Sequence, residues 1–250
     1  MVGTTSGRKR DIKKLSVSVV IPTLNEEANI GAVIEHVLAQ TRKPEEIIVV
    51  DNGSNDHTVA IAHSFPEVMV MHQNMPGVGN ARNMGAYQSR QDVLWFIDAD
   101  CRPGKTHLEK ALKVFADKSV GLVTGPADYE RKHLMVLQLM YATSVKVIGK
   151  MFRGATAVGA NIFVWRESFL DINGFDSRSA CMLEDVALAT AMVRDARKKV
   201  VYKKDLTMPT SRRRLEKDGV LWHMFVLGFG TLGLFFGLKP CPRFDKHMRS

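Results

Sequence analysis

Two aspartates that follow a buried-type strand are the residues of this sequence best suited to chemistry. Asp98 and Asp100 come directly after the apolar run 92–97 and are separated only by Ala99. In extended backbone, residues two apart point to the same face, so we expect both carboxylates to converge at the strand's carboxyl end. Like charges so close resist joint ionisation unless a cation lies between them. The pair therefore predicts either a site for Mg²⁺ or Mn²⁺ that bridges phosphate oxygens, or a surface turn.

A second acidic pair stands later in the chain. Glu184 and Asp185 open a segment, 184–197, whose apolar residues recur at helical spacing. The helix dipole stabilises carboxylates at a helix start whatever their function. On the residues alone, the pair therefore marks either a plain helix start or a functional site.

The elements that must position these acids alternate along the first half of the chain. Hydrophobic patterns predict strands at 15–21, 46–50, 68–72, 92–97 and 120–123, with helices at 26–40, after Asp56, at 79–90 and at 106–115. Strands that alternate with helices indicate an α/β fold with a doubly wound, mostly parallel sheet flanked by helices. In the second half we expect a helix at 134–150, a strand at 159–165, the helix at 184–197 and a strand at 199–202.

Two polar segments follow the first two predicted strands. They are Pro22-Thr23-Leu24-Asn25-Glu26 and Asp51-Asn52-Gly53-Ser54. Doubly wound sheets bind ligands at the carboxyl ends of their strands, which favours these segments as binding loops. Two plainer interpretations remain open, in which Asn25 is a helix cap and Asp51 is a turn residue.

The composition limits the classes of partner that this protein could bind. The chain has 250 residues, a net charge of +9 and 45% hydrophobic residues, which is typical of a globular protein with an anionic partner. No zinc-finger spacing, basic leucine zipper or aromatic RNA-binding signature is present, so we expect no nucleic-acid partner. A nucleotide, a lipid phosphate or an acidic membrane surface would match the charge. The three cysteines are few and far apart, which favours a reducing compartment over disulfides or zinc.

We expect three regions: a flexible basic tail at 1–14, a catalytic domain at 15–215, and an apolar and basic C-terminal segment at 216–250. Residues 219–238 contain no Asp, Glu, Lys or Arg and form an apolar C-terminal helical segment in this interpretation. Twenty such residues suffice to span a bilayer, or to lie in its headgroup region. The third alternative is a buried helical hairpin that covers the acceptor site.

Taken together, the motifs 22–26, 51–54, 98–100 and 184–185 resemble, in order and spacing, those of the family 2 glycosyltransferases. The resemblance covers about residues 16–215, and the segments 79–85 and 174–176 also match. It implies the glycosyltransferase A fold, a UDP- or GDP-sugar donor, Mg²⁺ or Mn²⁺, and inversion at the anomeric carbon. From the net charge and the apolar segment 219–238 we also expect a glycan or lipid-linked acceptor, synthesis of cell-surface polysaccharide, and a location on the cytoplasmic face of a membrane.

The resemblance implies roles for individual residues. Asp98 and Asp100 would hold the metal, Asp185 would be the general base for a hydroxyl acceptor, and Glu184 would support it. A lipid-phosphate acceptor is already anionic and would need no base. The donor-binding residues implied are Pro22, Thr23, Asn25, Glu26, Asp51, Gly53, Ser54, Arg82, Gly85, Asp98 and Ala99. Among these, Arg82 would reach the diphosphate and Gly85 would let the backbone approach the nucleotide.

The chain departs from the family pattern where relatives often present a metal-binding histidine. Thr210 and Ser211 stand there, followed by three arginines. We predict that Arg212 or Arg213 clamps the diphosphate, because guanidinium groups suit phosphate oxygens. The alternative is a basic patch beside a membrane.

Three other functions are weaker. The segment Gly77–Arg82 imitates a dinucleotide fingerprint but has Arg where the third glycine belongs, which argues against an NAD-dependent dehydrogenase. A nucleotidyltransferase would need a glycine-rich, lysine-bearing loop after the first strand, but this chain has Pro22-Thr23-Leu24-Asn25-Glu26 there. A non-catalytic nucleotide-sugar-binding protein would have little use for the second acidic pair.

Overall fold

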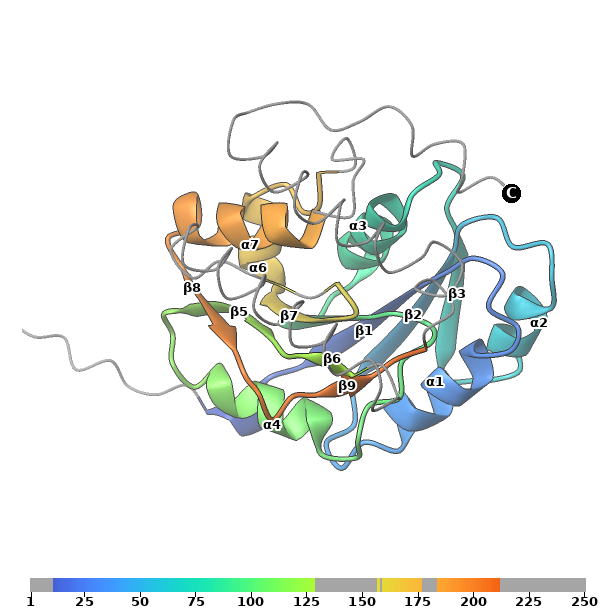
Figure 1. The fold of residues 1–250 in the computed structure, drawn as a ribbon, viewed down its shortest axis with the longest axis horizontal. Helices are drawn as coiled ribbons and strands as arrows, with labels where there is room; N and C mark the ends of the chain where they lie inside the picture. The colour runs from blue at the N-terminus through green and yellow to red at the C-terminus, as the bar shows by residue number, and fades with distance from the viewer. Residues whose placement is uncertain (1–10, 129–156, 158, 177–183, 212–250) are drawn as a thin grey trace, which may run out of the picture.

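The computed structural model describes residues 11–128, 157, 159–176 and 184–211 (Figure 1). In this part of the chain, a seven-stranded sheet has the order β3-β2-β1-β4-β7-β5-β8. Its strands are β1 Val17–Thr23, β2 Glu46–Asp51, β3 Val68–His72, β4 Val93–Ile97, β5 Val120–Thr124, β7 Asn161–Trp165 and β8 Lys199–Tyr202. The helices are η1 Ile12–Lys14, α1 Ile30–Leu38, α2 Thr58–His63, α3 Val78–Gln88, α4 His107–Val114, α6 Arg166–Asp171 and α7 Glu184–Arg194.

Helices cover both faces of the sheet, with α1, α2 and α4 on one side and α3, α6 and α7 on the other (Figure 1). Side chains alternate between two cores accordingly: Val19 packs under the first group of helices and Val20 under the second. All residues of β1, β4, β5 and β7 are buried. A strand buried on both faces is apolar along its whole length, which explains the continuous apolar runs.

The doubly wound, mostly parallel α/β sheet predicted from the sequence is confirmed. β1 runs parallel to β2 and β4, and β2 runs parallel to β3. β7 departs from this pattern because it runs antiparallel between β4 and β5. Its Phe163 stacks on Trp95 of β4 with 4.9 Å between ring centroids, which fixes the register of this pair.

A second, two-stranded sheet was not predicted. β6 (Ala127–Asp128) pairs in parallel with β9 (Met208–Pro209). Beyond β9, Thr210 forms an antiparallel bridge with Cys101, and the Arg102 N–H donates to the carbonyl of Pro209. The chain at 208–211 therefore returns to the carboxyl end of β4, where the two aspartates lie.

Most predicted elements have bounds close to the observed ones, and the bounds predicted for β3 and β8 are the same as those observed. α1 begins at Ile30 rather than at residue 26, and α6 was not predicted. The helix predicted at 134–150 and the segment at 216–250 lie outside the described residues, as do residues 1–10. Within the part that is described, no helix combines the length and the apolar character needed to cross a bilayer.

Candidate active site

The loops after β1 and β2 are joined by their own polar groups. The Asn25 N–H donates to the Ser54 hydroxyl over 2.9 Å, and the Asn55 N–H donates to the Asn25 side-chain oxygen over 2.8 Å. Asn25 has a φ of 54°, a left-handed conformation that asparagine tolerates better than most residues. The alternative of Asn25 as a cap of α1 is wrong, because its side chain joins the two loops instead.

Asp51 is 3% exposed and closes its own turn. Its carboxylate accepts hydrogen bonds from the Gly53 and Ser54 N–H groups over 3.1 and 3.2 Å, and Gly53 has a φ of 95°. Beside it, the buried hydroxyl of Thr23 has no hydrogen-bond partner among the residues that the structure describes. Because an unpaired buried hydroxyl costs free energy, Thr23 is the group here best placed to receive a ligand.

Arg82 joins the two acidic motifs. Its Nη2 donates to Asp98 Oδ1 over 2.7 Å, and its Nη1 donates to Glu184 Oε1 over 2.8 Å. Arg82 is 3% exposed, whereas Asp98 and Glu184 are 21% and 17% exposed. Its guanidinium carbon also lies 5.3 Å from the centroid of the Phe175 ring, within the range of a cation–π contact. One residue of each acidic motif is therefore bonded to the same guanidinium group.

Asp185 lies in the same cluster. Its Oδ2 accepts a hydrogen bond of 2.8 Å from the Gly159 N–H, and its Oδ1 accepts one of 3.0 Å from the Val186 N–H. Burial, and then the negative charge of Glu184, raise the pKa of Asp185 to about 7, against the opposing effect of Arg82. A carboxylate with a pKa near neutrality can accept a proton in one step and release it in the next.

Asp100 has different hydrogen-bond partners from Asp98. Strand β4 ends at Ile97, so the two aspartates lie in the turn that follows and not in extended backbone. The Thr210 hydroxyl donates to Asp100 Oδ1 over 3.1 Å, and the Ser211 hydroxyl donates to its Oδ2 over 2.7 Å. The prediction that Asp98 and Asp100 share one strand face is therefore wrong, because the strand stops before them.

The donor atoms around Asp100 fit a hard cation. They are carboxylate and hydroxyl oxygens, which Mg²⁺ and Mn²⁺ prefer. Among the described residues, no three His, Cys, Asp or Glu side chains form a metal-binding group. A cation here would consequently take further ligands from water or phosphate, as Mg²⁺ commonly does.

Three predicted donor-binding residues have other surroundings than expected. Gly85 lies inside the protein, where an added Cβ would clash with Val20 and lie 3.2 Å from Val50 Cγ2, so it brings α3 close to the sheet and not to a nucleotide. Arg82 contacts carboxylates where we expected it to reach a diphosphate. Ala99 is 3% exposed and carries no polar side chain. Arg212 and Arg213 lie outside the described residues.

Gly159 was missed by the sequence analysis. Its N–H donates to Asp185, and its carbonyl accepts a hydrogen bond of 3.1 Å from Arg82 Nη2. An added Cβ would lie 3.3 Å from Arg82 Nη2 and 3.5 Å from Asp185 Oδ2, so there is little room for a larger residue. The available signal was a glycine just before a buried strand, where backbone often approaches a functional group.

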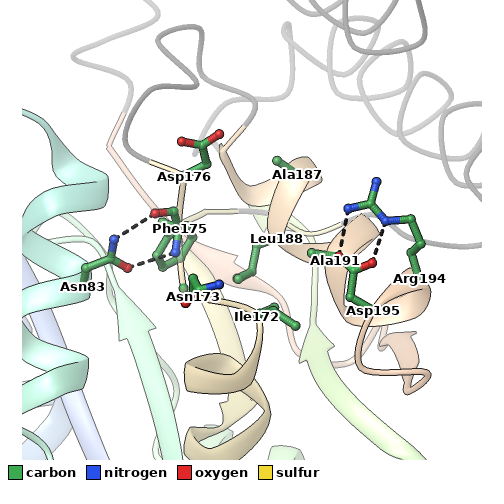
Figure 2. Close-up of a pocket in the computed structure, with 11 residues that line it drawn as sticks. Asn83, Ile172, Asn173, Phe175, Asp176, Ala187, Leu188, Ala191, Arg194 and Asp195 are labelled. Carbon is green, nitrogen blue, oxygen red and sulfur yellow. Dashed lines mark hydrogen bonds and ion pairs between the residues drawn. The ribbon is translucent and has the colours of Figure 1, made fainter. Parts of the chain in front are cut away.

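A pocket of about 470 Å³ lies between α7 and the segment 172–176 that follows α6 (Figure 2). In the wall of this pocket, the Asn83 side chain donates a hydrogen bond to the Phe175 carbonyl over 2.8 Å and accepts one from the Phe175 N–H over 2.9 Å. None of the predicted site residues lines it. We therefore assign the candidate active site by its chemistry, at the carboxyl ends of β1, β2 and β4, and not by this pocket.

Comparison with known proteins identifies the family. The model described as "Glycosyl transferase family 2" matches residues 18–167, which contain the loops after β1 and β2 and the Asp98–Asp100 motif. The chain belongs to this family.

Curated relatives agree. Glycosyltransferase AglE of Haloferax volcanii is 30% identical over 168 residues, which are 64% of this chain and 55% of AglE. An uncharacterized glycosyltransferase of Mycobacterium bovis is 30% identical over 183 residues, which are 70% of this chain and 79% of that protein. This family 2 chain thus matches little more than half the length of AglE.

Solved structures share the fold. Glucosyl-3-phosphoglycerate synthase from Mycobacterium tuberculosis, solved with Mn²⁺, UDP and glucosyl-3-phosphoglycerate, is 21% identical with a TM-score of 0.65, covering 92% of this chain and 82% of its own. A mannosyltransferase from Pyrobaculum calidifontis, solved with GDP-Man and Mn²⁺, is 21% identical with a TM-score of 0.63. The match covers 78% of this chain and 56% of the mannosyltransferase chain. These similarities show that the family 2 chain has the glycosyltransferase A fold.

Proposed function

We propose that this chain is an inverting, metal-assisted glycosyltransferase that moves a sugar from a UDP- or GDP-sugar to a hydroxyl or lipid-phosphate acceptor. The observation that carries the proposal is the cluster in which Arg82 holds Asp98 and Glu184, with Asp185 beside them. Both acidic motifs of a family 2 glycosyltransferase thus meet at one edge of the sheet. The similar structures solved with UDP or GDP-Man and Mn²⁺ support the choice of donor and metal.

The donor would bind across the carboxyl ends of β1, β2 and β4. Thr23, Asp51 and Glu26 would contact the base and ribose, and the hydrogen bonds of Asn25 with Ser54 and Asn55 would hold the two loops in place before the donor arrives. Such preorganisation reduces the entropy lost on binding. Pro22 of β1 pairs with Val50 of β2 and keeps these two strand ends together.

Asp100, with the hydroxyls of Thr210 and Ser211, would hold the cation. When bound, Mg²⁺ or Mn²⁺ would supply positive charge that stabilises the departing nucleoside diphosphate. The hydroxyls orient the Asp100 carboxylate, and Arg82 forms an ion pair with the neighbouring Asp98. Arg212 or Arg213, which follow Ser211 directly, would add a clamp on the diphosphate.

Asp185 would accept the proton of an acceptor hydroxyl. A pKa of about 7 lets a useful fraction of the carboxylate be ionised at neutral pH while it still binds the proton during attack. The N–H groups of Gly159 and Val186 fix the direction of this carboxylate. Attack from the face opposite the diphosphate inverts the anomeric centre.

We also propose that the protein works at the cytoplasmic face of a membrane, with residues 219–238 in contact with lipid, and makes lipid-linked or cell-surface glycan. The net charge of +9 and the apolar composition of that segment support this. The undecaprenyl-phosphate 4-deoxy-4-formamido-L-arabinose transferase of Pectobacterium atrosepticum, 42% identical over 99 residues, supports a lipid-phosphate acceptor. Its match covers 36% of this chain and 30% of that protein.

The activity is tested by nucleoside diphosphate release. The full chain is incubated with UDP- and GDP-sugars, with Mg²⁺ or Mn²⁺, and with hydroxyl or polyprenyl-phosphate acceptors. We expect release that requires metal and falls at least about 100-fold in Asp100→Ala, because the leaving group loses its charge stabilisation. Metal-independent release that survives this substitution would refute the mechanism. Membrane recovery of the full chain is compared with that of a chain ending at Lys217, and equal recovery would refute the lipid contact.

A further inference from the structure

Arg82 occupies a position that its expected role does not explain. Its guanidinium lies between the Asp98–Asp100 motif, on the donor side, and the Glu184–Asp185 pair, on the acceptor side. Its Nη2 also donates to the Gly159 carbonyl over 3.1 Å, and the N–H of the same glycine donates to Asp185. One side chain is thus bonded, directly or through a single residue, to both acidic motifs.

Little of this side chain is free to contact a diphosphate. Arg82 is 3% exposed, and its Nη1 and Nη2 are both engaged by carboxylates. Its Nε is buried and has no hydrogen-bond partner among the described residues. Asp98 and Glu184, which are the more exposed members of the network, separate the guanidinium from the surface.

The positive charge of Arg82 acts on several acidic groups of the network. Burial lowers the pKa of Arg82, but the carboxylates of Asp98 and Glu184 raise it by more, so the guanidinium stays charged. Three carboxylates, of Asp98, Glu184 and Asp185, act on this guanidinium. Without it, like charges would repel one another in a poorly hydrated site and the carboxylates would move apart or become protonated.

We propose that Arg82 is a positioning residue that couples the donor and acceptor sides of the site, and that it does not bind the diphosphate. It holds Glu184 at a fixed place relative to Asp98 and, through the Gly159 peptide, keeps Asp185 directed at the acceptor. The proposal rests on the glycosyltransferase function proposed above. Catalysis depends on such geometry, because small misplacements of a reacting group cost large factors in rate.

Arg82→Lys tests this role. Lysine keeps the charge but has one nitrogen in place of the planar fork, so it cannot serve Asp98, Glu184 and Gly159 together. We expect kcat to fall at least about 30-fold while the donor dissociation constant, measured by titration calorimetry with Mg²⁺, changes less than about threefold. Donor binding weakened about tenfold or more at nearly normal kcat would instead identify a diphosphate contact and overturn the proposal, as would kinetics like those of the wild type.

Arg194→Lys is the matched control. Arg194 also donates through two nitrogens, Nε and Nη2, but to the single carboxylate of Asp195 at the exposed end of α7. Its kcat and donor affinity should equal those of the wild type. A loss as large as that of Arg82→Lys would show a general sensitivity to such exchanges and would overturn the assignment.

Glu184→Gln gives a second test of the proposal. It replaces the first test when Arg82→Lys does not fold. It removes the charge that Arg82 holds while leaving the Asp98 contact. We expect the same fall in kcat with donor binding retained. Where Arg82→Lys folds, we expect no further loss when both substitutions are combined, because the two residues act as a unit. Full activity of Glu184→Gln, or strictly additive losses, would overturn the proposal. Absence of release by the wild type with every donor would instead refute the proposed function.

Discussion

The Ser211 hydroxyl donates a hydrogen bond of 2.7 Å to Asp100 Oδ2, across 111 positions in the sequence. Thr210 donates to the other carboxylate oxygen, so both oxygens of Asp100 are oriented from the segment after β9. These hydroxyls stand in the segment where the sequence departs from the expected family pattern. The site of this chain therefore offers oxygen atoms around Asp100, which suit hard cations.

Removing these hydroxyls should weaken metal binding. Thr210→Val together with Ser211→Ala leaves Asp100 without its two orienting donors, each a bond to a charged group worth about 1.5–3 kcal/mol. We expect the Mg²⁺ concentration for half-maximal thermal stabilisation in the presence of UDP or GDP to rise at least about tenfold. Thr207→Val is the control, because the exposed Thr207 hydroxyl only donates to the Lys204 carbonyl. Equal metal titrations for both variants would contradict this prediction.

The activity on a hydroxyl acceptor should depend on the ionisation of Asp185. Burial and Glu184 raise its pKa to about 7, and the base works in its ionised form, so kcat should rise about tenfold per pH unit below pH 7 and level off above it. Asp185→Asn should lower kcat by a factor of about 10²–10⁴ and leave donor binding intact. A kcat that does not change between pH 5.5 and 8.5 would point to an anionic lipid-phosphate acceptor instead.

The same carboxyl should make stability depend on pH. The pKa of Asp185 is raised from 3.8 to about 7 on folding, so the folded state binds its proton more tightly than the unfolded state does. Its contribution therefore favours folding below pH 4 relative to neutral pH, and that advantage is lost as the pH rises toward 7. Asp185→Asn, which has no such charge, should gain stability on the order of 2 kcal/mol over the wild type at pH 8 and much less at pH 5.

Urea unfolding of both proteins at the two pH values measures this difference. A variant that is less stable than the wild type at pH 8 would show that ionised Asp185 is well accommodated, and the raised pKa would be wrong. The test is independent of the kinetic one, because it needs neither donor nor acceptor.

Gly85 should be essential for packing and not for donor contact. An alanine Cβ would clash with Val20 and press on Val50, which forces α3 away from the sheet. We expect Gly85→Ala to lose about 1–3 kcal/mol of stability, or several degrees in Tm. Gly104→Ala is the control, because its Cβ would meet no atom within 4 Å. Unchanged Tm with weakened donor binding in Gly85→Ala would restore the role that we first expected.

The sequence by itself determined the order of elements and the motifs. Continuous apolar runs and helical spacing are local signals, so the bounds of β3 and β8 and the parallel first half followed from them. The position of Asp51 and Glu26 at strand ends followed in the same way, because the carboxyl ends of parallel strands meet at one edge.

Only the tertiary structure decided which groups meet. The long-range partners of Arg82, Asp100 and Asp185 lie 16 to 111 positions away in the sequence, and no local pattern specifies such contacts. The antiparallel insertion of β7 brings Gly159 to Asp185, and the β6–β9 pair brings Ser211 to Asp100. Hydrogen bonds and charge pairs form wherever the packing of the chain brings donor and acceptor together, so a motif identifies the groups and the fold assigns their partners.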